Sequence, residues 1–423
     1  MLIDKQAPNF FNTRGFYDMQ KLQQFLRAGH FPTLVSSFLY FDFSFMIWML
    51  LAALGIFLSE EFGLGPAQKG LMVSIPLLGG TLLRIPMGLL SDRFGSKKVA
   101  LSGMAVTMIP LVWGWLSAKS MPEVVCIGLL LGVAGASFAV ALPLASRWYP
   151  AKYQGLVMGI AGAGNSGSVL ATLFAPSLAK AYGWHSVFGL AIIPMSIVFL
   201  FFLFTAKDCP GTINRKGILE YFAPIKSRDA ITFCLLYSVT FGGFVGIASF
   251  LPIFFYDQYG IEKVTTGLYT SYCIIGASML RPVGGYLSDK FGGVNVLSLV
   301  LLTLSVILIG ISYLFPVNIT LPLFIGLMAC LGLGNGSVFQ LVPLRFKKDI
   351  GVVTGFVGAF GGLGGFLVPN LLGSLKSVSG SFATGFVILA LITISSAALV
   401  FFTNLLIWKK ADSNQTELGL EGV

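Results

Sequence analysis

Apolar stretches of about twenty residues recur along almost the whole chain, and short segments rich in glycine, proline and charged residues separate them. A helix needs about 20 apolar residues to cross the hydrocarbon core of a bilayer, which is about 30 Å thick. The pattern therefore predicts twelve membrane-spanning helices, near 34–58, 70–90, 99–118, 123–146, 155–179, 186–206, 231–256, 264–287, 294–315, 320–343, 352–375 and 381–408. The longest polar interruption, 207–230, divides these spans six and six.

The expected fold is an all-α membrane protein with two pseudo-symmetric six-helix bundles. The expected segments are a cytoplasmic N-terminal segment at 1–33 with a short interfacial helix at 17–27, an N-terminal bundle at 34–206, a cytoplasmic linker at 207–230, a C-terminal bundle at 231–408 and a cytoplasmic tail at 409–423. Each such chain would contain a complete site, so a monomer suffices.

The composition agrees with a membrane location and excludes several classes of protein. Hydrophobic residues make up 56% of the 423 residues and charged residues only 10%, whereas soluble domains carry roughly 25% charged residues. A soluble enzyme, a disordered chain and a nucleic-acid binder are therefore excluded. The five cysteines are scattered without metal-ligand spacing, and only two histidines occur, so neither a metal site nor a cofactor is expected. The spans contain no catalytic pair, which argues against an enzyme.

The net charge of +10 is explained by orientation. With the N-terminus inside the cell, the inner segments hold 20 Lys and Arg residues and the outer loops hold 5. Cytoplasmic loops are enriched in these residues, so both termini are expected in the cytoplasm of a multi-pass protein of the cytoplasmic membrane, in contact with lipid. The two arginines left over, Arg84 and Arg281, fall inside predicted spans.

The two halves of the sequence repeat. RIPMGLLSDRFG at 84–95 matches RPVGGYLSDKFG at 281–292, with an offset of 197 residues. Glycines at 155, 159 and 162 match glycines at 351, 355 and 358, with an offset of 196. Six-span repeats in the same orientation imply a pseudo-two-fold axis along the membrane normal and a substrate site between the halves.

The repeat places the two arginines at one depth. Each lies eight residues before an aspartate at the cytoplasmic end of its span, which is about 12 Å at 1.5 Å per residue. Two buried cations with only Asp42 as an acid well inside a span imply a missing negative charge, which an anionic substrate would supply. The alternative is that the arginines bond to backbone carbonyls or pair with Asp42. A guanidinium fork matches two oxygens of carboxylate, nitrate, nitrite or phosphate, and does not choose among them.

Spans 5 and 11 are rich in glycine, which allows close helix packing and movement. Asn165 is a polar side chain in span 5, where it could donate to an oxygen of a small substrate. The glycines expected to serve packing or gating are Gly162, Gly164, Gly167, Gly358, Gly361 and Gly362.

The loop Gly88-x3-Asp92-Arg93-x-Gly95-x-Lys97-Lys98 resembles the signature of the major facilitator superfamily. The core Gly162-x-Gly164-Asn165-x-Gly167, together with an arginine in spans 2 and 8, resembles the nitrate/nitrite porter (NarK-type) family. The resemblance implies a secondary transporter that moves nitrate and nitrite by alternating access. Two arginines would bind the anion, two phenylalanines would sandwich it, and a tyrosine and an asparagine would complete the site, which assigns these roles to Arg84, Arg281, Phe138, Phe241, Tyr237 and Asn165.

Several alternatives stay open. Asp42 is a candidate for proton coupling, a wet carboxylate near the cytoplasmic face or a cap of a neighbouring helix. Asp92, Arg93 and Asp289 are expected to form a latch between the bundles. The substrate could instead be an organic phosphate or carboxylate, and a non-transporting anion sensor is a further alternative. The sequence leaves proton symport and nitrate/nitrite exchange undecided.

Overall fold

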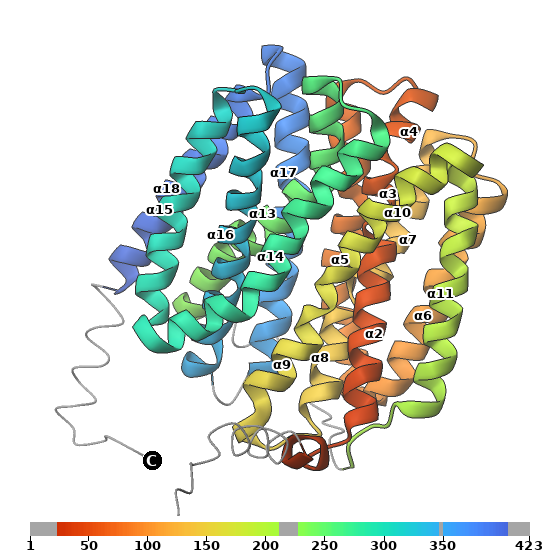
Figure 1. Cartoon of the computed structure of the whole chain (residues 1–423). Coiled ribbons are helices and arrows are strands. Elements are labelled where there is room, and N and C mark those ends of the chain that lie inside the picture. Colours follow the sequence, from red (N-terminus) through yellow and green to blue (C-terminus); the bar gives the residue numbers. More distant parts are fainter. Residues whose placement is uncertain (1–22, 211–226, 347–349, 405–423) are drawn as a thin grey trace, which may run out of the picture.

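The computed structural model describes residues 23–210, 227–346 and 350–404, and helices account for nearly all of them (Figure 1). The first half contains α2 (Phe31–Trp48), α3 (Leu50–Ala53), α4 (Gly55–Glu61), α5 (Pro66–Phe94), α6 (Ser96–Leu116), α7 (Met121–Gly135), α8 (Phe138–Ser146), the 3-10 turn η1 (Ala151–Tyr153), α9 (Gln154–Gly162), the 3-10 turn η2 (Ala163–Ser166), α10 (Gly167–Tyr182) and α11 (Trp184–Thr205). The second half contains α13 (Arg228–Tyr259), α14 (Lys263–Phe291), α15 (Gly293–Ser312), α16 (Val317–Arg345), α17 (Ile350–Ser379) and α18 (Ala383–Thr403).

The helical membrane fold is confirmed, but one of the twelve predicted spans is less apolar than the others. Within the described residues, eleven helical segments are long and apolar enough to cross a membrane. The predicted span at 264–287 is the 29-residue helix α14, which is not among the eleven because hydroxyl side chains and Arg281 make it less apolar. Residues 17–22 of the predicted interfacial helix, residues 211–226 of the linker and the tail at 409–423 lie outside the described residues.

The helices α2–α11 gather on one side of the molecule and α13–α18 on the other (Figure 1). Across the seam between them, α5 packs against α17 and α10 packs against α14. The first described residues of the chain and the end of α18 lie at the same end of the molecule (Figure 1). We call this the terminal end, and the opposite end the outer end.

The sequence repeat is visible in the backbone at the ends of α5 and α14. Both helices are 29 residues long, and each is followed by a glycine of the repeated motif. Gly95 has φ of 95° and Gly292 has φ of 87°, a conformation that residues with a Cβ atom rarely adopt. The two motif glycines therefore end the arginine-bearing helices in the same way in both halves.

Predicted span 5 is interrupted in its middle. The helices α9 and α10 are joined by η2, which contains Asn165. At Gly167, the first residue of α10, a Cβ atom would lie 1.8 Å from the carbonyl oxygen of Asp42. Only glycine permits this approach, so the interrupted span packs directly on the backbone of α2.

Candidate functional site

Arg84 lies in the centre of the molecule and is 1% exposed. Its Nε donates to the carbonyl oxygen of Gly135 at 3.2 Å, and its Nη1 donates to the carbonyl oxygen of Gly358. Gly135 belongs to α7 and Gly358 to α17, so this side chain crosses the seam between the halves. Aromatic rings surround the guanidinium carbon Cζ, with centroids 5.1 Å away at Phe241, 5.4 Å at Trp48 and 5.6 Å at Phe138.

Arg281 approaches the same centre from α14. Its Nη2 lies 3.5 Å from the hydroxyl of Tyr237, at the limit for a hydrogen bond. Its Cζ lies 5.5 Å from the ring centroid of Phe339 and 6.0 Å from that of Phe138. Phe138 thus lies beside both guanidinium groups.

Neither guanidinium is neutralised within the described residues, where no carboxylate forms an ion pair with Arg84 or Arg281. Arg84 Nη2 and Arg281 Nη1 are buried and have no hydrogen-bond partner among the described residues. A buried hydrogen-bond donor of a charged group that lacks a partner lowers the stability of the folded state by about 1–3 kcal/mol or more. The site therefore presents two donors to an acceptor that would have to come from outside the chain.

Four aromatic rings form the wall of this site. Tyr237 and Phe241, one turn apart on α13, are stacked with centroids 5.0 Å apart and an interplanar angle of 7°. Phe339 on α16 meets Tyr237 edge to face at 4.8 Å and Phe138 at 5.9 Å. The structure thus brings together five of the six predicted substrate-binding residues, which are Arg84, Arg281, Phe138, Tyr237 and Phe241.

Asn165 is engaged with its own turn. In the amide orientation that satisfies its hydrogen bonds, the side-chain nitrogen donates to the carbonyl oxygens of Gly162 at 3.1 Å and Ala163 at 3.3 Å. The side chain is 1% exposed and stabilises the interruption of span 5. No described contact joins it to either arginine, so its substrate role stays a prediction.

Asp42 is bonded to the same interruption. Its Oδ1 accepts a hydrogen bond from the hydroxyl of Ser166 at 2.7 Å, and the carboxylate also accepts from the backbone N–H of Gly167. The first residue of α10 thus donates to this carboxylate, which agrees with the alternative that Asp42 caps a neighbouring helix. Among the described residues it forms no ion pair with an arginine.

The predicted glycines differ in what surrounds them. A Cβ atom at Gly361 would lie 2.5 Å from Tyr237, at Gly362 2.4 Å from the hydroxyl of Thr81, and at Gly164 2.6 Å from Phe41. At Gly358 it would meet Phe138 at an ordinary 3.6 Å, and at Gly162 it would meet nothing within 4 Å. Gly361 therefore leaves room for the Tyr237–Phe241 stack, while Gly162 borders open space.

The predicted latch residues lie at the terminal end. Asp92 forms an ion pair with Arg147, the C-cap residue of α8. This contact joins two helices of the same half and does not link the bundles. Arg93 and Asp289 are exposed. Three ion pairs between described residues cross the seam at the outer end and are described below.

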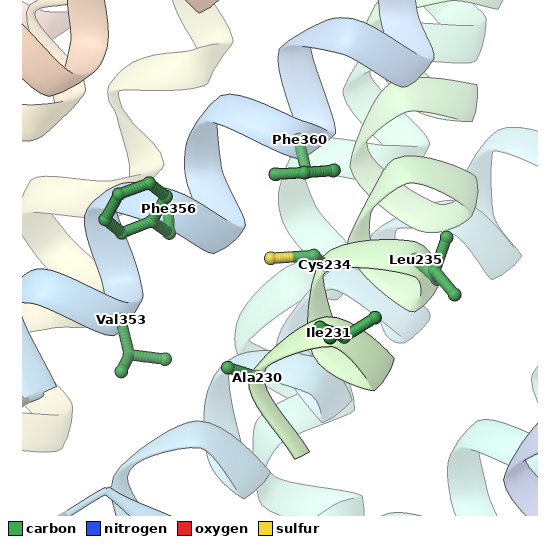
Figure 2. A pocket seen from close by; sticks show the side chains of 7 residues that line it. All are labelled: Ala230, Ile231, Cys234, Leu235, Val353, Phe356 and Phe360. Atoms are coloured by element: carbon green, nitrogen blue, oxygen red, sulfur yellow. The ribbon is translucent and has the colours of Figure 1, made fainter. Parts of the chain in front are cut away.

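A separate cavity of about 50 Å³ lies between α13 and α17 (Figure 2). Its lining consists of Ala230, Ile231, Cys234, Leu235, Val353, Phe356 and Phe360. None of these side chains carries a charge, so this cavity has no group that could bind an anion.

The sequence pattern missed Phe339, Trp48 and the carbonyls of Gly135 and Gly358. Phe339 stands 201 residues after Phe138, close to the offsets of the sequence repeat, and this spacing could have indicated it. Asn335 and Gln340 lie close to Phe339 in the sequence, in the segment 334–340. Both have a buried side-chain oxygen without a partner among the described residues.

Comparison with known proteins adds a family and a set of relatives. The family model described as Major Facilitator Superfamily matches residues 36–369. The chain is 32% identical over 383 residues to the nitrite extrusion protein of Bacillus subtilis (strain 168), covering 90% of this chain and 95% of the relative. It is 33% identical to the probable nitrate transporter NarT of Staphylococcus carnosus (strain TM300), covering 82% and 89%. It is 29% identical to the probable nitrate/nitrite antiporter NarK1 of Thermus thermophilus, covering 94% and 97%.

A similar solved structure is the crystal structure of a bacterial homologue of the human lysosomal transporter Spinster, in an inward-facing and occupied conformation. It has a TM-score of 0.67 and 17% sequence identity, and the match covers 89% of this chain and 97% of that one. At this identity the likeness concerns the fold alone.

Proposed function

Because this chain belongs to the Major Facilitator Superfamily, we propose that it transports nitrate and nitrite and holds the anion between Arg84 and Arg281. The relatives named for nitrite extrusion, nitrate transport and nitrate/nitrite antiport support this substrate class. The observation that carries the site assignment is the pair of guanidinium groups, buried at Arg84 and partly buried at Arg281, without a carboxylate partner among the described residues.

The rings favour a flat ion over a tetrahedral one. Phe138 lies beside both guanidinium groups, and Phe241 and Phe339 lie beside one each. In the proposed bound state, the rings would restrict the height of the site and leave its plane open to the arginine donors. A planar trigonal anion fits such a space, whereas the oxygens of phosphate point out of any plane.

The positions of the two guanidinium groups suggest how the transport cycle works. One arginine belongs to each half, so an anion that bonds to both attracts the halves towards each other. In the described state Arg84 already crosses the seam to the carbonyl of Gly358 on α17. We propose that the anion competes for this guanidinium and that the halves rock around the fixed site.

Nitrate and nitrite are expected to raise the melting temperature of the purified protein, and chloride and phosphate to leave it nearly unchanged. A ligand at 100 times its dissociation constant stabilises the folded state by about 2.7 kcal/mol, since it binds only that state. Thermal unfolding in detergent with each sodium salt at equal ionic strength measures this effect. Stabilisation by phosphate and not by nitrate would contradict the proposal and favour the organic-phosphate exchanger.

The coupling of transport is tested at Asp42. Import of one anion into a negative-inside cell is opposed by about 2.3 kcal/mol per 100 mV, so uptake needs protons or an exchanged anion. Asparagine at position 42 keeps an oxygen that accepts from Ser166 and Gly167. If Asp42 couples protons, Asp42→Asn abolishes uptake driven by an acidic exterior and leaves nitrate/nitrite exchange in proteoliposomes intact. Equal losses in both assays would assign Asp42 to the structure of the interrupted span alone.

We further propose that the terminal end faces the cytoplasm, that the membrane is the cytoplasmic membrane and that a monomer is the transporting unit. The excess of Lys and Arg in the segments at this end supports the orientation. Both arginines of the site come from one chain, which supports the monomer.

A further inference from the structure

An ion pair with low exposure crosses the seam at the outer end of the molecule. The ammonium nitrogen of Lys69, in the first turn of α5, lies 2.8 Å from each carboxylate oxygen of Asp257, in the last turn of α13. Each of the two side chains is 16% exposed. The pair therefore joins the first half to the second where little water screens it.

A second charged group crosses the seam beside the first. Glu60, near the end of α4, forms an ion pair with Lys263, the first residue of α14, and accepts a hydrogen bond from the hydroxyl of Tyr256 at 2.5 Å. Partial burial raises the pKa of Glu60, but Lys263 and Tyr256 outweigh this and leave the pKa below its ordinary value. The carboxylate therefore stays charged at neutral pH, and the contact is lost only as the pH falls through that lowered pKa.

The backbones beneath these ion pairs are in close contact. A Cβ atom at Gly70 on α5 would lie 2.3 Å from the carbonyl oxygen of Pro369 on α17. At Gly267 on α14 it would lie 2.3 Å from the carbonyl oxygen of Thr172 on α10. Both helix pairs that form the seam thus meet without a gap near the outer end.

Two glycines nearer the terminal end have open space beside them. A Cβ atom at Gly159 on α9 or at Gly355 on α17 would meet nothing within 4 Å. These two glycines are equivalent in the sequence repeat. The contacts at Gly70 and Gly267 therefore close the seam between the described helices at the outer end.

We propose that Lys69, Asp257, Glu60, Lys263 and Tyr256 form an outer latch that holds this state closed and opens in every transport cycle. The proposal rests on transport by rocking of the two halves. Any tilt that opens the outer end separates α5 from α13 and α4 from α14, so both ion pairs must break together. A third pair across the seam, Lys180 with Glu262, is 65% and 58% exposed and contributes little to the latch.

The latch is tested by the distance between the halves at the outer end. Spin labels are placed at Tyr182 and Tyr313, which are 68% and 70% exposed and belong to different halves, in a background whose five cysteines are replaced. Ion pairs at partly exposed sites shift equilibria by up to about fivefold. Asp257→Asn is expected to increase the population with a long distance by about fivefold in anion-free protein.

Two further variants serve as controls. The exchange Lys69→Asp with Asp257→Lys is expected to restore the short distance. Glu123→Gln removes an outer-end carboxylate that accepts hydrogen bonds from the backbone N–H groups of Lys119 and Ser120 in its own half, and should leave the distance unchanged. If Asp257→Asn and Glu60→Gln both keep the wild-type distances, the latch is refuted.

The outcome is independent of the substrate, because the distances are measured without an anion. Failure of nitrate to bind or to be transported would refute the proposed function and leave the latch standing. Unchanged distances in a protein that transports nitrate would refute the latch alone.

Discussion

Lysine in place of Arg281 is expected to lower nitrate transport by about 10- to 150-fold while the protein stays folded. The substitution keeps the positive charge but replaces a planar fork of donors with a single ammonium group. Hydrogen bonds to charged groups contribute about 1.5–3 kcal/mol each, and the loss of one accounts for this range. The same result is expected for Arg84→Lys, which also loses the bonds to the carbonyls of Gly135 and Gly358.

Uptake of labelled nitrate into proteoliposomes measures the effect, and the melting temperature reports folding. Arg228→Lys is the matched control, because Arg228 is exposed at the start of α13, outside the aromatic site. Full transport by both Arg84→Lys and Arg281→Lys would refute the assignment of the anion site.

Alanine at position 361 is expected to destabilise the protein by about 1–3 kcal/mol and to abolish most of its transport. The added methyl group would lie 2.5 Å from Cδ1 of Tyr237 and 2.9 Å from Cδ1 of Phe241. Overpacking of this kind forces side chains from their rotamers. The stacked rings would have to move, and Tyr237 would leave the hydroxyl position that it holds near Arg281.

Gly355→Ala is the matched control on the same helix. Its methyl group would enter open space, and alanine is about 1 kcal/mol more favourable than glycine in a helix interior. We expect this variant to be as stable as the wild type or more stable. Thermal unfolding measures the stability of both variants, and nitrate uptake measures their transport. If Gly361→Ala and Gly355→Ala behave alike, the methyl group at position 361 does not displace the stacked rings, and the prediction is wrong.

The helices could be predicted from the sequence because the bilayer imposes their length. The twelve predicted spans coincide with described helices, since a run of about 20 apolar residues is stable in lipid only as a helix. Spans 1, 4 and 5 are each divided into shorter helices, which the sequence pattern did not predict. In span 5, the 3-10 turn at Asn165 depends on its contact with α2, and this contact is tertiary.

The arginines could be predicted and most of their partners could not. A charge inside an apolar span is conspicuous in any sequence, and the repeat placed Arg84 and Arg281 at one depth. Which group each arginine contacts depends on the rotation of every helix about its axis. Phenylalanine is abundant in this chain, with 38 residues, so only the spacing of Phe339 from Phe138 could have distinguished it from the others.

The contacts between the halves, like the neighbours of the arginines, could not be predicted from the sequence. Asp92 belongs to a repeated loop motif, which predicts a latch between the bundles; its ion pair with Arg147 lies within one half, and the latch stays a prediction. Lys69, Asp257, Glu60 and Lys263 belong to no motif. Their pairing across the seam follows from how the two halves pack against each other.

The amino-acid sequence alone determined that this chain spans a membrane, that its halves repeat and that two cations lie inside it, because hydrophobicity and helix length act along the chain. Tertiary structure decided that Arg84 bonds to backbone carbonyls rather than to Asp42, that Phe138 lies beside both arginines and that the outer end is closed. These features depend on distances between residues remote in sequence, which only the packing of the helices sets.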